Sequence, residues 1–402
     1  MFVGITNRPR PYAWGSPTAI AELLGREPSG GPEAELWLGA HPGSPSRIID
    51  PAATGGPADL AAWIAADPAR ALGPYAPAAR LPFLLKLLAA GSPLSLQAHP
   101  TAEQALEGFR RENEAGVPID APHRNYRDAH PKPELIYALS ERFEALCGFR
   151  PPTEYRELLA ALRRRAEPGT EVAPLDGLLE LAASDGALPG VVEWLSRAGE
   201  DVDAVVALVA ELAARPPVPG EDGRFDAAFA TAVDLAAEYP GDPGIVVSLL
   251  LNRVSLRRGE ALFLPAGNIH AYLSGLGVEL MAASDNVLRG GLTPKHVDVP
   301  ELLNVLDFTP RAVPLMAPER PSPGLEVYRP AVPDFVLVRF AGAAPATFRL
   351  HGPAIAICTR GSVAISGASS ARLDRGSAVY ITPDEGELTL AGDGEVFLAT
   401  TG

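Results

Sequence analysis

The sequence predicts a mainly β fold with an α-helical insertion, built from two jelly-roll β-barrels and a helical domain. The 42 prolines and 39 glycines among 402 residues favour a chain with many turns. Residues 1–152 and 239–313 hold short apolar runs bounded by turn residues, which are typical of strands, and residues 314–402 return to that pattern. Residues 153–238 instead have Ala, Leu, Glu and Arg at helical spacing. We therefore expect one discontinuous β domain from the first two ranges, a helical insertion, and a C-terminal barrel.

Composition sets the broad class of the protein. A chain of 402 residues with 47% apolar and 21% charged residues is long enough for two or three globular domains. Cys147 and Cys358 lie in apolar surroundings and suggest no disulfide framework, and residues 1–10 lack a signal-peptide core. We expect a cytoplasmic protein, a monomer or weak homo-oligomer, with no membrane partner. The formal charge of -15 argues against nucleic-acid binding and means that an anionic ligand would need a local group of cations.

Two neighbouring strands are expected near residue 90. Residues 81–89 (LPFLLKLLA) form an apolar run interrupted only by Lys86, as in a buried strand. The Gly-Ser-Pro at 91–93 ends it, and 94–99 follows as a second strand. Because side chains alternate along a strand, three polar residues share one face of the second strand: Ser95, Gln97 and His99. This face offers a donor and two metal ligands, or it is the solvent face of an ordinary amphipathic strand.

A third strand is expected at residues 132–139 (KPELIYAL). Its alternation sets Lys132 and Glu134 on one face. A solvated sheet edge is the plain alternative for such a segment.

The middle of the chain is expected to be helical. Five segments show helical spacing between Gly and Pro breaks: 155–166, 175–183, 191–197, 202–214 and 225–237. None of them contains a group of side chains typical of a site, so we expect a helical insertion that packs on the barrel.

Residues 259–274 (GEALFLPAGNIHAYLS) contain the most informative pattern in the chain. They match G-x5-P-x-G-x2-H-x3-N, the pattern of a metal-binding strand in cupin barrels, except that Ser274 replaces Asn. A short strand and a tight turn place His270 at the start of the next strand, at the mouth of a small barrel. The predicted barrels are therefore of the cupin type. Four residues now form a complete N/O ligand set for a divalent metal: Gln97, His99, Glu134 and His270.

These motifs resemble those of a known enzyme family. Its sequence features occur here at 35–42 (ELWLGAHP), 82–86 (PFLLK), 97–100 (QAHP), 132–134 (KPE) and 264–298. Over about 1–150 and 240–310 the chain resembles the type I phosphomannose isomerases. The resemblance implies a single zinc ion bound by Gln97, His99, Glu134 and His270, and an essential arginine at Arg289. It also makes 1–152 with 239–313 the catalytic domain. The family usually has Asn-His where this chain has His130-Pro131.

The function implied by the resemblance is that of an aldose–ketose isomerase, which interconverts mannose 6-phosphate and fructose 6-phosphate. A proton moves between C1 and C2 through an enediolate, whose developing charge needs an electrophile. The lack of thiolate ligands favours a catalytic zinc over a structural one. Arg289 is a poor base, so we expect it to stabilise the enediolate or to steer the proton transfer. Glu279 is the preferred base, with Asp285 and Lys132 as alternatives.

The substrate phosphate needs cations in this acidic chain. We expect Lys86, Ser95 and Lys295 to bind it, with Arg124 as a further candidate, and we also assign Lys132 to substrate binding. Lys86 lies in an apolar run and must reach an anion or solvent. It is otherwise a lysine whose stem is buried at a barrel end, and Lys295 is otherwise a surface residue.

The C-terminal barrel shows a weak internal repeat. Residues 258–265 resemble 375–383, and the position of His270 corresponds to Glu387. We therefore expect a barrel that keeps the shape without the ligands and has a structural role or forms an oligomer contact. His41 is expected to be a loop histidine.

Two other functions use the same residues. An iron-dependent cupin oxygenase would also use His and Glu ligands, but it leaves Arg289 and the phosphate-binding residues unexplained. A non-catalytic sugar-phosphate sensor would keep the pocket and should bring a partner-binding element, which the sequence does not show.

Overall fold

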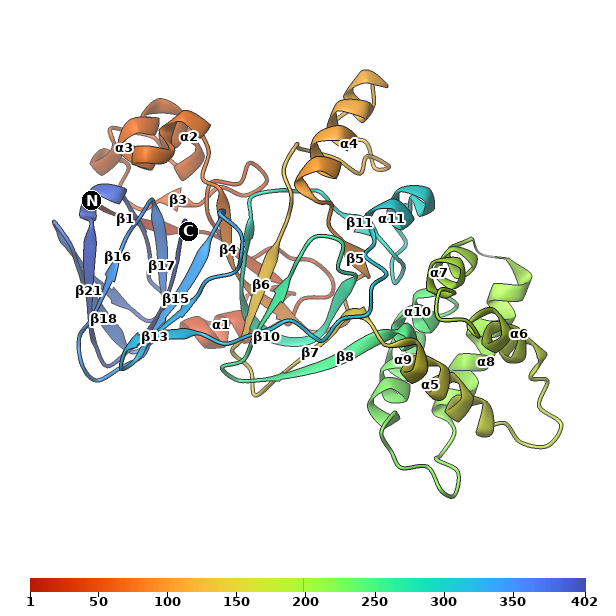
Figure 1. Cartoon of the computed structure of the whole chain (residues 1–402). Coiled ribbons are helices and arrows are strands. Elements are labelled where there is room, and N and C mark those ends of the chain that lie inside the picture. The colour runs from red at the N-terminus through yellow and green to blue at the C-terminus, as the bar shows by residue number, and fades with distance from the viewer. Residues whose placement is uncertain (198) are drawn as a thin grey trace.

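In the computed structural model, which describes residues 1–197 and 199–402, the chain forms three adjoining parts (Figure 1). A β-sandwich lies at one end, a central sheet in the middle, and a group of helices at the other end. Both termini lie on the sandwich. The mainly β fold with a helical insertion is confirmed, although none of the sheets in the described residues closes on itself.

The central sheet has ten strands in the order β11-β5-β10-β6-β9-β12, with β2, β4, β7 and β8 paired beside this path. Its strands are β2 (Glu35–Leu38), β4 (Phe83–Ala90), β5 (Gln97–Ala98), β6 (Glu134–Ala138), β7 (Arg142–Phe149), β8 (Leu251–Arg257), β9 (Ala261–Leu264), β10 (His270–Ala282), β11 (Leu288–Arg289) and β12 (Leu315–Met316). Strand β10 pairs with β4, β5, β6 and β7. The strands predicted to hold ligands therefore meet on this one strand.

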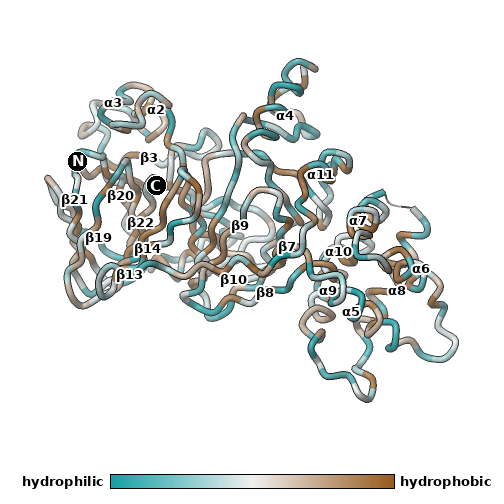
Figure 2. The backbone as a smooth tube through the Cα atoms, viewed as in Figure 1, coloured by the Kyte–Doolittle hydropathy of each residue, from teal (hydrophilic) through white to brown (hydrophobic). Residues whose placement is uncertain are grey.

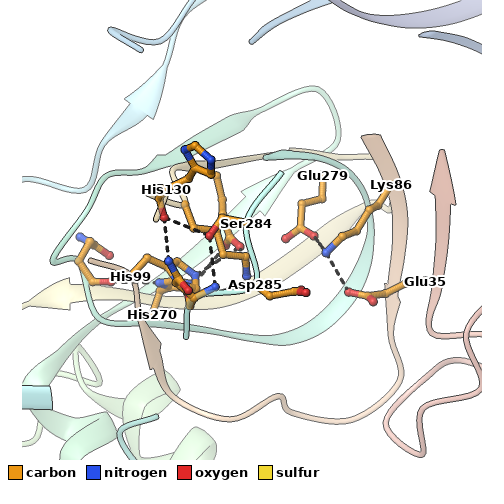
Figure 3. Close-up of polar contacts among 12 residues, drawn as sticks. Glu35, Lys86, His99, His130, His270, Glu279, Ser284 and Asp285 are labelled. Atoms are coloured by element: carbon orange, nitrogen blue, oxygen red, sulfur yellow. Dashed lines mark hydrogen bonds and ion pairs between the residues drawn. The ribbon is translucent and has the colours of Figure 1, made fainter. Parts of the chain in front are cut away.

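A register shift in β10 determines which side chains reach the site. The pairing of β10 with β7 shifts by one residue between Tyr272 and Ser274. An extra residue reverses the face on which later side chains lie. His270 and Glu279 are an odd number of residues apart, yet both side chains lie in the same region (Figure 3). The bulge thus lets the two ends of β10 serve one site.

The sandwich consists of an eight-stranded and a four-stranded sheet. The larger sheet contains β13 (Glu319–Ser322), β14 (Leu325–Tyr328), β15 (Val336–Phe340), β22 (Glu395–Thr400), β17 (Ala354–Arg360), β20 (Ala378–Ile381), β1 (Phe2–Thr6) and β3 (Arg47–Ile48). The smaller contains β16 (Ala346–Arg349), β21 (Glu387–Gly392), β18 (Ser362–Ser366) and β19 (Ser370–Asp374). Strands β1 and β3 come from the N-terminal range expected in the catalytic domain, but β1 pairs with β20. The N-terminal range therefore contributes strands to both β units, and the domain boundaries remain a prediction.

The helical part contains α5 (Pro152–Arg164), α6 (Ala173–Leu181), α7 (Leu188–Ser196), α8 (Glu200–Ala214), α9 (Asp226–Glu238) and α10 (Gly244–Leu250). The first five lie where the sequence predicts helices. Helix α10 was not predicted, because its seven residues are all buried and show no polar face. Hydrophobic residues follow the strands and the inner helices (Figure 2).

The remaining helices lie around the two β units. They are α1 (Ala19–Leu24), α2 (Leu60–Ala66), α3 (Pro68–Leu72), α4 (Ala102–Glu114) and α11 (Val299–Val305), with short 3-10 turns at Pro51–Thr54, Gly73–Ala78 and Pro383–Glu385. Helices α2 and α3 lie over one end of the sandwich, and α4 projects from the body of the molecule (Figure 1). Among the described helices, no membrane-crossing candidate combines sufficient length with sufficient hydropathy.

Candidate metal centre and active site

Three buried side chains from three strands or strand ends converge in the central sheet. His99 Nε2 lies 3.3 Å from one oxygen of Glu134, and His270 Nε2 lies 3.3 Å from the other. Their potential ligand atoms all lie within 4.8 Å of one another. The Glu134 carboxylate is therefore held between two imidazoles.

Backbone carbonyls determine which imidazole nitrogens are free. His99 Nδ1 lies 2.8 Å from the Asn286 carbonyl oxygen, and His270 Nδ1 lies 3.1 Å from that of Asn268. A carbonyl only accepts, so each Nδ1 is the donor and each Nε2 has a free lone pair. Burial, and next the Lys132 ammonium, lowers the pKa of His99 to about 4, so this ring is neutral at neutral pH.

The arrangement leaves acceptor groups that face one another. His99 Nε2 is buried and has no hydrogen-bond partner in the described structure. Its lone pair faces a Glu134 oxygen, which is also an acceptor. Burial alone would raise the pKa of Glu134, but the nearby Lys132 holds it well below its usual range, so the group is a carboxylate. A divalent metal would accept electron pairs from both the free Nε2 and the carboxylate, so these residues fit such an ion.

Gln97 and Arg289 are in register with this group. In the sheet, Gln97 lies directly opposite His270 on one side and Arg289 on the other. Directly opposed residues of antiparallel strands point to the same face. The predicted ligand set of one amide, two imidazoles and one carboxylate is therefore brought together with Arg289. Such a set suits zinc or a similar divalent ion.

Lys86 lies in a buried charge cluster beside this group. Its Nζ donates to Glu279 at 2.8 Å and to Glu35 at 3.4 Å, and Trp37 Nε1 donates to Glu35 at 2.8 Å. Figure 3 shows Lys86 between the two carboxylates. Burial would lower the pKa of Lys86, but the two carboxylates raise it and keep the ammonium charged. The anion that Lys86 had to reach is thus supplied by the protein, and sequence reasoning missed Glu35, which lies in the quoted segment 35–42.

Glu279 and Asp285, the candidate bases, differ in environment. Burial, followed by the charge of Glu134, raises the pKa of Glu279 against the opposing effect of Lys86. Asp285 has a half-exposed side chain, and its Oδ2 lies 3.2 Å from His41 Nε2. Burial would raise its pKa, but the His41 contact lowers it.

His41 is therefore more than a loop histidine. Gly43 N–H donates to His41 Nδ1 at 3.1 Å, so Nδ1 is the acceptor and Nε2–H donates to Asp285. The ring packs edge-on against Trp37 at a centroid distance of 4.9 Å. His41 lies in a loop, as predicted, but its contact with Asp285 was not predicted, because that partner lies far along the chain.

Three cations lie near one another: Arg289, Arg127 and Lys295. Burial, followed by the charge of Arg127, lowers the pKa of Arg289. The pKa of the exposed Lys295 is lowered by burial of part of its stem and by both arginines. In the part of the chain that the structure describes, none of these three cations has a carboxylate at ion-pair distance. This is a suitable place for a dianion in an acidic protein; Arg127 was not predicted.

Two of the other residues predicted to bind substrate, Lys132 and Arg124, already have partners in the protein. Lys132 Nζ lies 2.9 Å from Glu134 Oε1. Arg124 donates to Tyr126 O at 2.7 Å and to Asn113 Oδ1, in α4, at 2.6 Å, so its donors are used by the loop and by that helix. Ser95 is half-buried on the segment between β4 and β5.

A cavity of about 360 Å³ adjoins this region. Its polar lining is formed by His41, Arg80, Arg127, Asp128 and Asp285, and its apolar lining includes Phe83. The three potential ligands do not line it, so the metal group lies beside this cavity rather than in its wall.

Comparison with known proteins places the chain in a family. The family described as "Phosphomannose isomerase type I, catalytic domain" matches residues 3–152. The chain is 37% identical to mannose-6-phosphate isomerase of Escherichia coli (strain K12), covering 98% of this chain and 97% of that protein. It is 32% identical to the Homo sapiens protein of the same name, covering 93% and 92%.

Solved structures agree with this assignment. A zinc-bound holo structure of mannose 6-phosphate isomerase superposes with a TM-score of 0.86 at 33% identity, covering 100% of this chain and 99% of the other. The apo form from Salmonella typhimurium gives 0.85 at 33% identity, with the same coverage. The sequence identity, the coverage and the fold together show that the chain belongs to the type I mannose-6-phosphate isomerase family.

Proposed function

We propose that the chain is a zinc-dependent aldose–ketose isomerase that interconverts mannose 6-phosphate and fructose 6-phosphate. The observation on which this depends most is the buried His99–Glu134–His270 group, in which a bare Nε2 lone pair faces a carboxylate oxygen. The names of the relatives support the substrate, and the zinc-bound neighbour supports the metal.

The four ligands we assign to zinc are Gln97, His99, Glu134 and His270. With one anionic ligand, a zinc site would keep a net charge near +1 and supply a Lewis acid at the sugar oxygens. Lys132 contacts Glu134 and helps to keep it ionised.

Arg289 is assigned to the developing enediolate. It lies opposite Gln97 and has no carboxylate partner in the described residues, so its donors are available to an oxyanion. A donor already in place where charge develops lowers the barrier without reorganisation.

We assign the C1–C2 proton transfer to Glu279. Burial and the charge of Glu134 raise the pKa of Glu279 toward neutral pH, which suits a general base. The hydrogen bond from Lys86 at 2.8 Å orients the carboxylate. The pKa of Asp285 is lowered, so it is a weaker base. We assign it to proton transfers at hydroxyl groups, such as ring opening.

The phosphate is assigned to the cations near Lys295. Lys295 and Arg127 lack carboxylate partners within the described chain and lie close enough to affect one another, and we assign the half-buried Ser95 hydroxyl to the same group. Lys86 and Lys132 are each engaged by a carboxylate, so we assign them to substrate hydroxyls rather than to the phosphate.

The test is a coupled assay of purified protein with mannose 6-phosphate, as isolated, after chelation and after zinc is restored. We expect turnover to be lost and then regained, and metal analysis to give about one zinc per chain. His270→Ala and Glu134→Ala should lose both metal and turnover, whereas His351→Ala, an exposed residue on the sandwich, should keep both.

Other outcomes separate the alternatives. Oxygen consumption would indicate an oxygenase, and tight sugar-phosphate binding without turnover would indicate a sensor. Active protein without a bound divalent ion would refute the zinc-dependent mechanism.

A further inference from the structure

Asn286 connects the metal group to a second part of the chain. The residue is fully buried. Its backbone oxygen accepts the hydrogen bond from His99 Nδ1 at 2.8 Å, which fixes the ring so that Nε2 points to Glu134.

The side chain of Asn286 bonds to the segment 127–130. Oδ1 accepts from Arg127 N–H at 2.7 Å and from Asp128 N–H at 3.2 Å. Nδ2 donates to Asp128 O at 2.8 Å and to His130 O at 2.9 Å. All these partners are main-chain atoms, so the amide holds the path of the backbone.

Neighbouring residues support the same contact. Ser284 Oγ donates to His130 O at 3.1 Å and accepts from Asn286 N–H at 3.2 Å. Asp285 N–H donates to Asp128 Oδ2 at 2.9 Å. The segments 284–286 and 127–130 are therefore held side by side.

The segment 127–130 lies just before a proposed metal ligand in the chain. Two residues after His130 comes Lys132, and Glu134 follows at the start of β6. The backbone carbonyl of Asn286 thus bonds to the ligand His99. Its side-chain amide bonds to the segment 127–130, which leads to the ligand Glu134. The contacts use the carbonyl of residue 130 and no N–H of residue 131, so they tolerate the His130-Pro131 pair found here.

We infer that Asn286 is a positioning residue that fixes His99 relative to the Lys132–Glu134 segment and thereby determines metal affinity. The inference rests on the proposed metal-dependent function. Only a primary amide of this length presents an acceptor to two N–H groups and donors to two carbonyls. Aspartate has no donor, and alanine would remove the partner of Arg127 N–H, Asp128 N–H and Asp128 O and leave His130 O to Ser284 alone.

The test compares Asn286→Ala with Asn7→Ala. Asn7 is the matched control, because its Nδ2 also donates to two main-chain carbonyls, Trp37 O at 2.9 Å and Ser44 O at 3.0 Å, and neither belongs to a ligand. Zinc affinity is measured by competition with a chromophoric chelator. We expect Asn286→Ala to bind zinc about 10- to 100-fold more weakly, as for the loss of an outer-shell partner, and Asn7→Ala to lower stability alone.

Two further readouts do not depend on turnover. Amide hydrogen exchange of Arg127 and Asp128 in the metal-free protein should speed up in Asn286→Ala and in Asn286→Gln, whose longer side chain displaces the amide. In Asn286→Asp the two acceptor contacts remain, so exchange at these amides should change less while zinc affinity still falls. The visible spectrum of the cobalt-loaded protein should also shift in Asn286→Ala.

The outcomes are distinguishable. If Asn286→Ala loses stability but binds zinc normally, Asn286 is only structural and the inference is wrong. If that variant does not fold, Ser284→Ala removes a smaller part of the same contact and should give a smaller loss of zinc affinity; unchanged affinity there would likewise refute the inference. A wild-type protein that binds no zinc would instead refute the proposed function.

Discussion

Every buried charge of the candidate site faces a group of opposite sign. Lys86 contacts Glu279 and Glu35, and Lys132 contacts Glu134. Such pairs cost desolvation free energy and are costly to break from one side. The cations near Arg289 differ, because they lie at the surface side and have no carboxylate partner in the described residues. The charged residues of the site therefore form two groups: those paired with a charge of the protein, and those without such a partner in the described chain.

Arg289→Lys tests the second group. Lysine keeps the charge but loses the planar set of donors. We expect kcat to fall by about a hundredfold or more, as for the loss of an oxyanion donor, with KM little changed. Steady-state kinetics with mannose 6-phosphate measure both. A normal kcat with a greatly raised KM would make Arg289 a phosphate anchor instead.

Lys86→Met tests the first group. The substitution leaves Glu279 and Glu35 without their cation, and breaking such a buried pair costs about 3–5 kcal/mol of unfolding free energy at neutral pH. The pKa of Glu279 is already raised, and losing Lys86 raises it further. A carboxyl whose folded pKa exceeds its unfolded value destabilises the protein above that folded pKa, and the penalty is relieved as pH falls through it.

The measurement is urea unfolding of Lys86→Met between pH 8 and pH 5. The deficit relative to wild type should shrink toward the acid end. Lys295→Met removes an exposed cation from the same region and should change stability by no more than about 0.5 kcal/mol. Equal effects of the two substitutions would contradict the assigned role of Lys86.

At the scale of elements, β10 and α4 show how the site is framed. Strand β10 pairs with four other strands and changes face through its register shift. Helix α4 begins with a capping box formed by Thr101 and Gln104. It is attached to α11 by Arg111, whose guanidinium lies 2.7 Å from Glu301, and by Tyr126, whose hydroxyl donates to the same carboxylate at 2.5 Å. Gln104 Nε2 also donates to the Asn304 carbonyl oxygen at 2.9 Å, so α4 is attached to α11 at Glu301 and at Asn304.

Gly108→Ala tests how closely α4 packs on the ring of Tyr126. An added Cβ at Gly108 would lie 2.4 Å from Tyr126 Cε2, so the ring or the helix must move. Gly177, in α6, has nothing within 4 Å of such a Cβ. We expect Gly177→Ala to stabilise by about 0.5–1 kcal/mol, as in an ordinary helix, and Gly108→Ala to destabilise by about 1–3 kcal/mol. Thermal unfolding of both variants measures this; a stabilised Gly108→Ala would show that α4 does not pack as described.

At the scale of the whole molecule, the N-terminal strand joins the two β units. Strand β1 pairs with β20 on one side and β3 on the other. A single hydrophobic core then contains residues of β4 and β10 from the central sheet and of β17 and β22 from the sandwich. The catalytic sheet is therefore supported by a unit that supplies none of the assigned ligands.

Glu385→Gln tests this support. Glu385 is buried, its Oε1 lies 2.7 Å from the Met1 ammonium, and Ser369 N–H donates to its Oε2 at 2.7 Å. Burial would raise the pKa of Glu385, but these contacts lower it. A carboxyl with a lowered folded pKa contributes stability above its unfolded pKa of about 4.3, and the contribution is lost as pH falls through the folded pKa.

We expect Glu385→Gln to lose about 1–3 kcal/mol of unfolding free energy at pH 7 and less at pH 4, measured by urea unfolding of chelated protein. Glu387→Gln, two residues further on an exposed position of β21, should stay within about 0.5 kcal/mol and keep its turnover. A loss of turnover beyond about tenfold in either folded, zinc-loaded variant would place the sandwich in the active site.

The sequence by itself determined the local structure and much of the chemistry. Alternation at 94–99 and 132–139 and the turn before His270 predicted which side chains share a face, because strand geometry depends on neighbouring residues. Helical spacing predicted five helices for the same reason. The ligand types then indicated a divalent metal, and the resemblance of 264–298 and the other motifs to a known enzyme family implied an isomerase.

Only the tertiary structure decided how distant residues pair. In the folded chain Lys86 pairs with Glu279, 193 residues away. Asn286 contacts the segment before β6. The tertiary structure also joined His41 to Asp285 and inserted β1 into the sandwich sheet. These contacts arise when separate strands and loops pack against one another. No local spacing encodes them, because side-chain periodicity determines the face on which a residue lies but not which remote residue it meets.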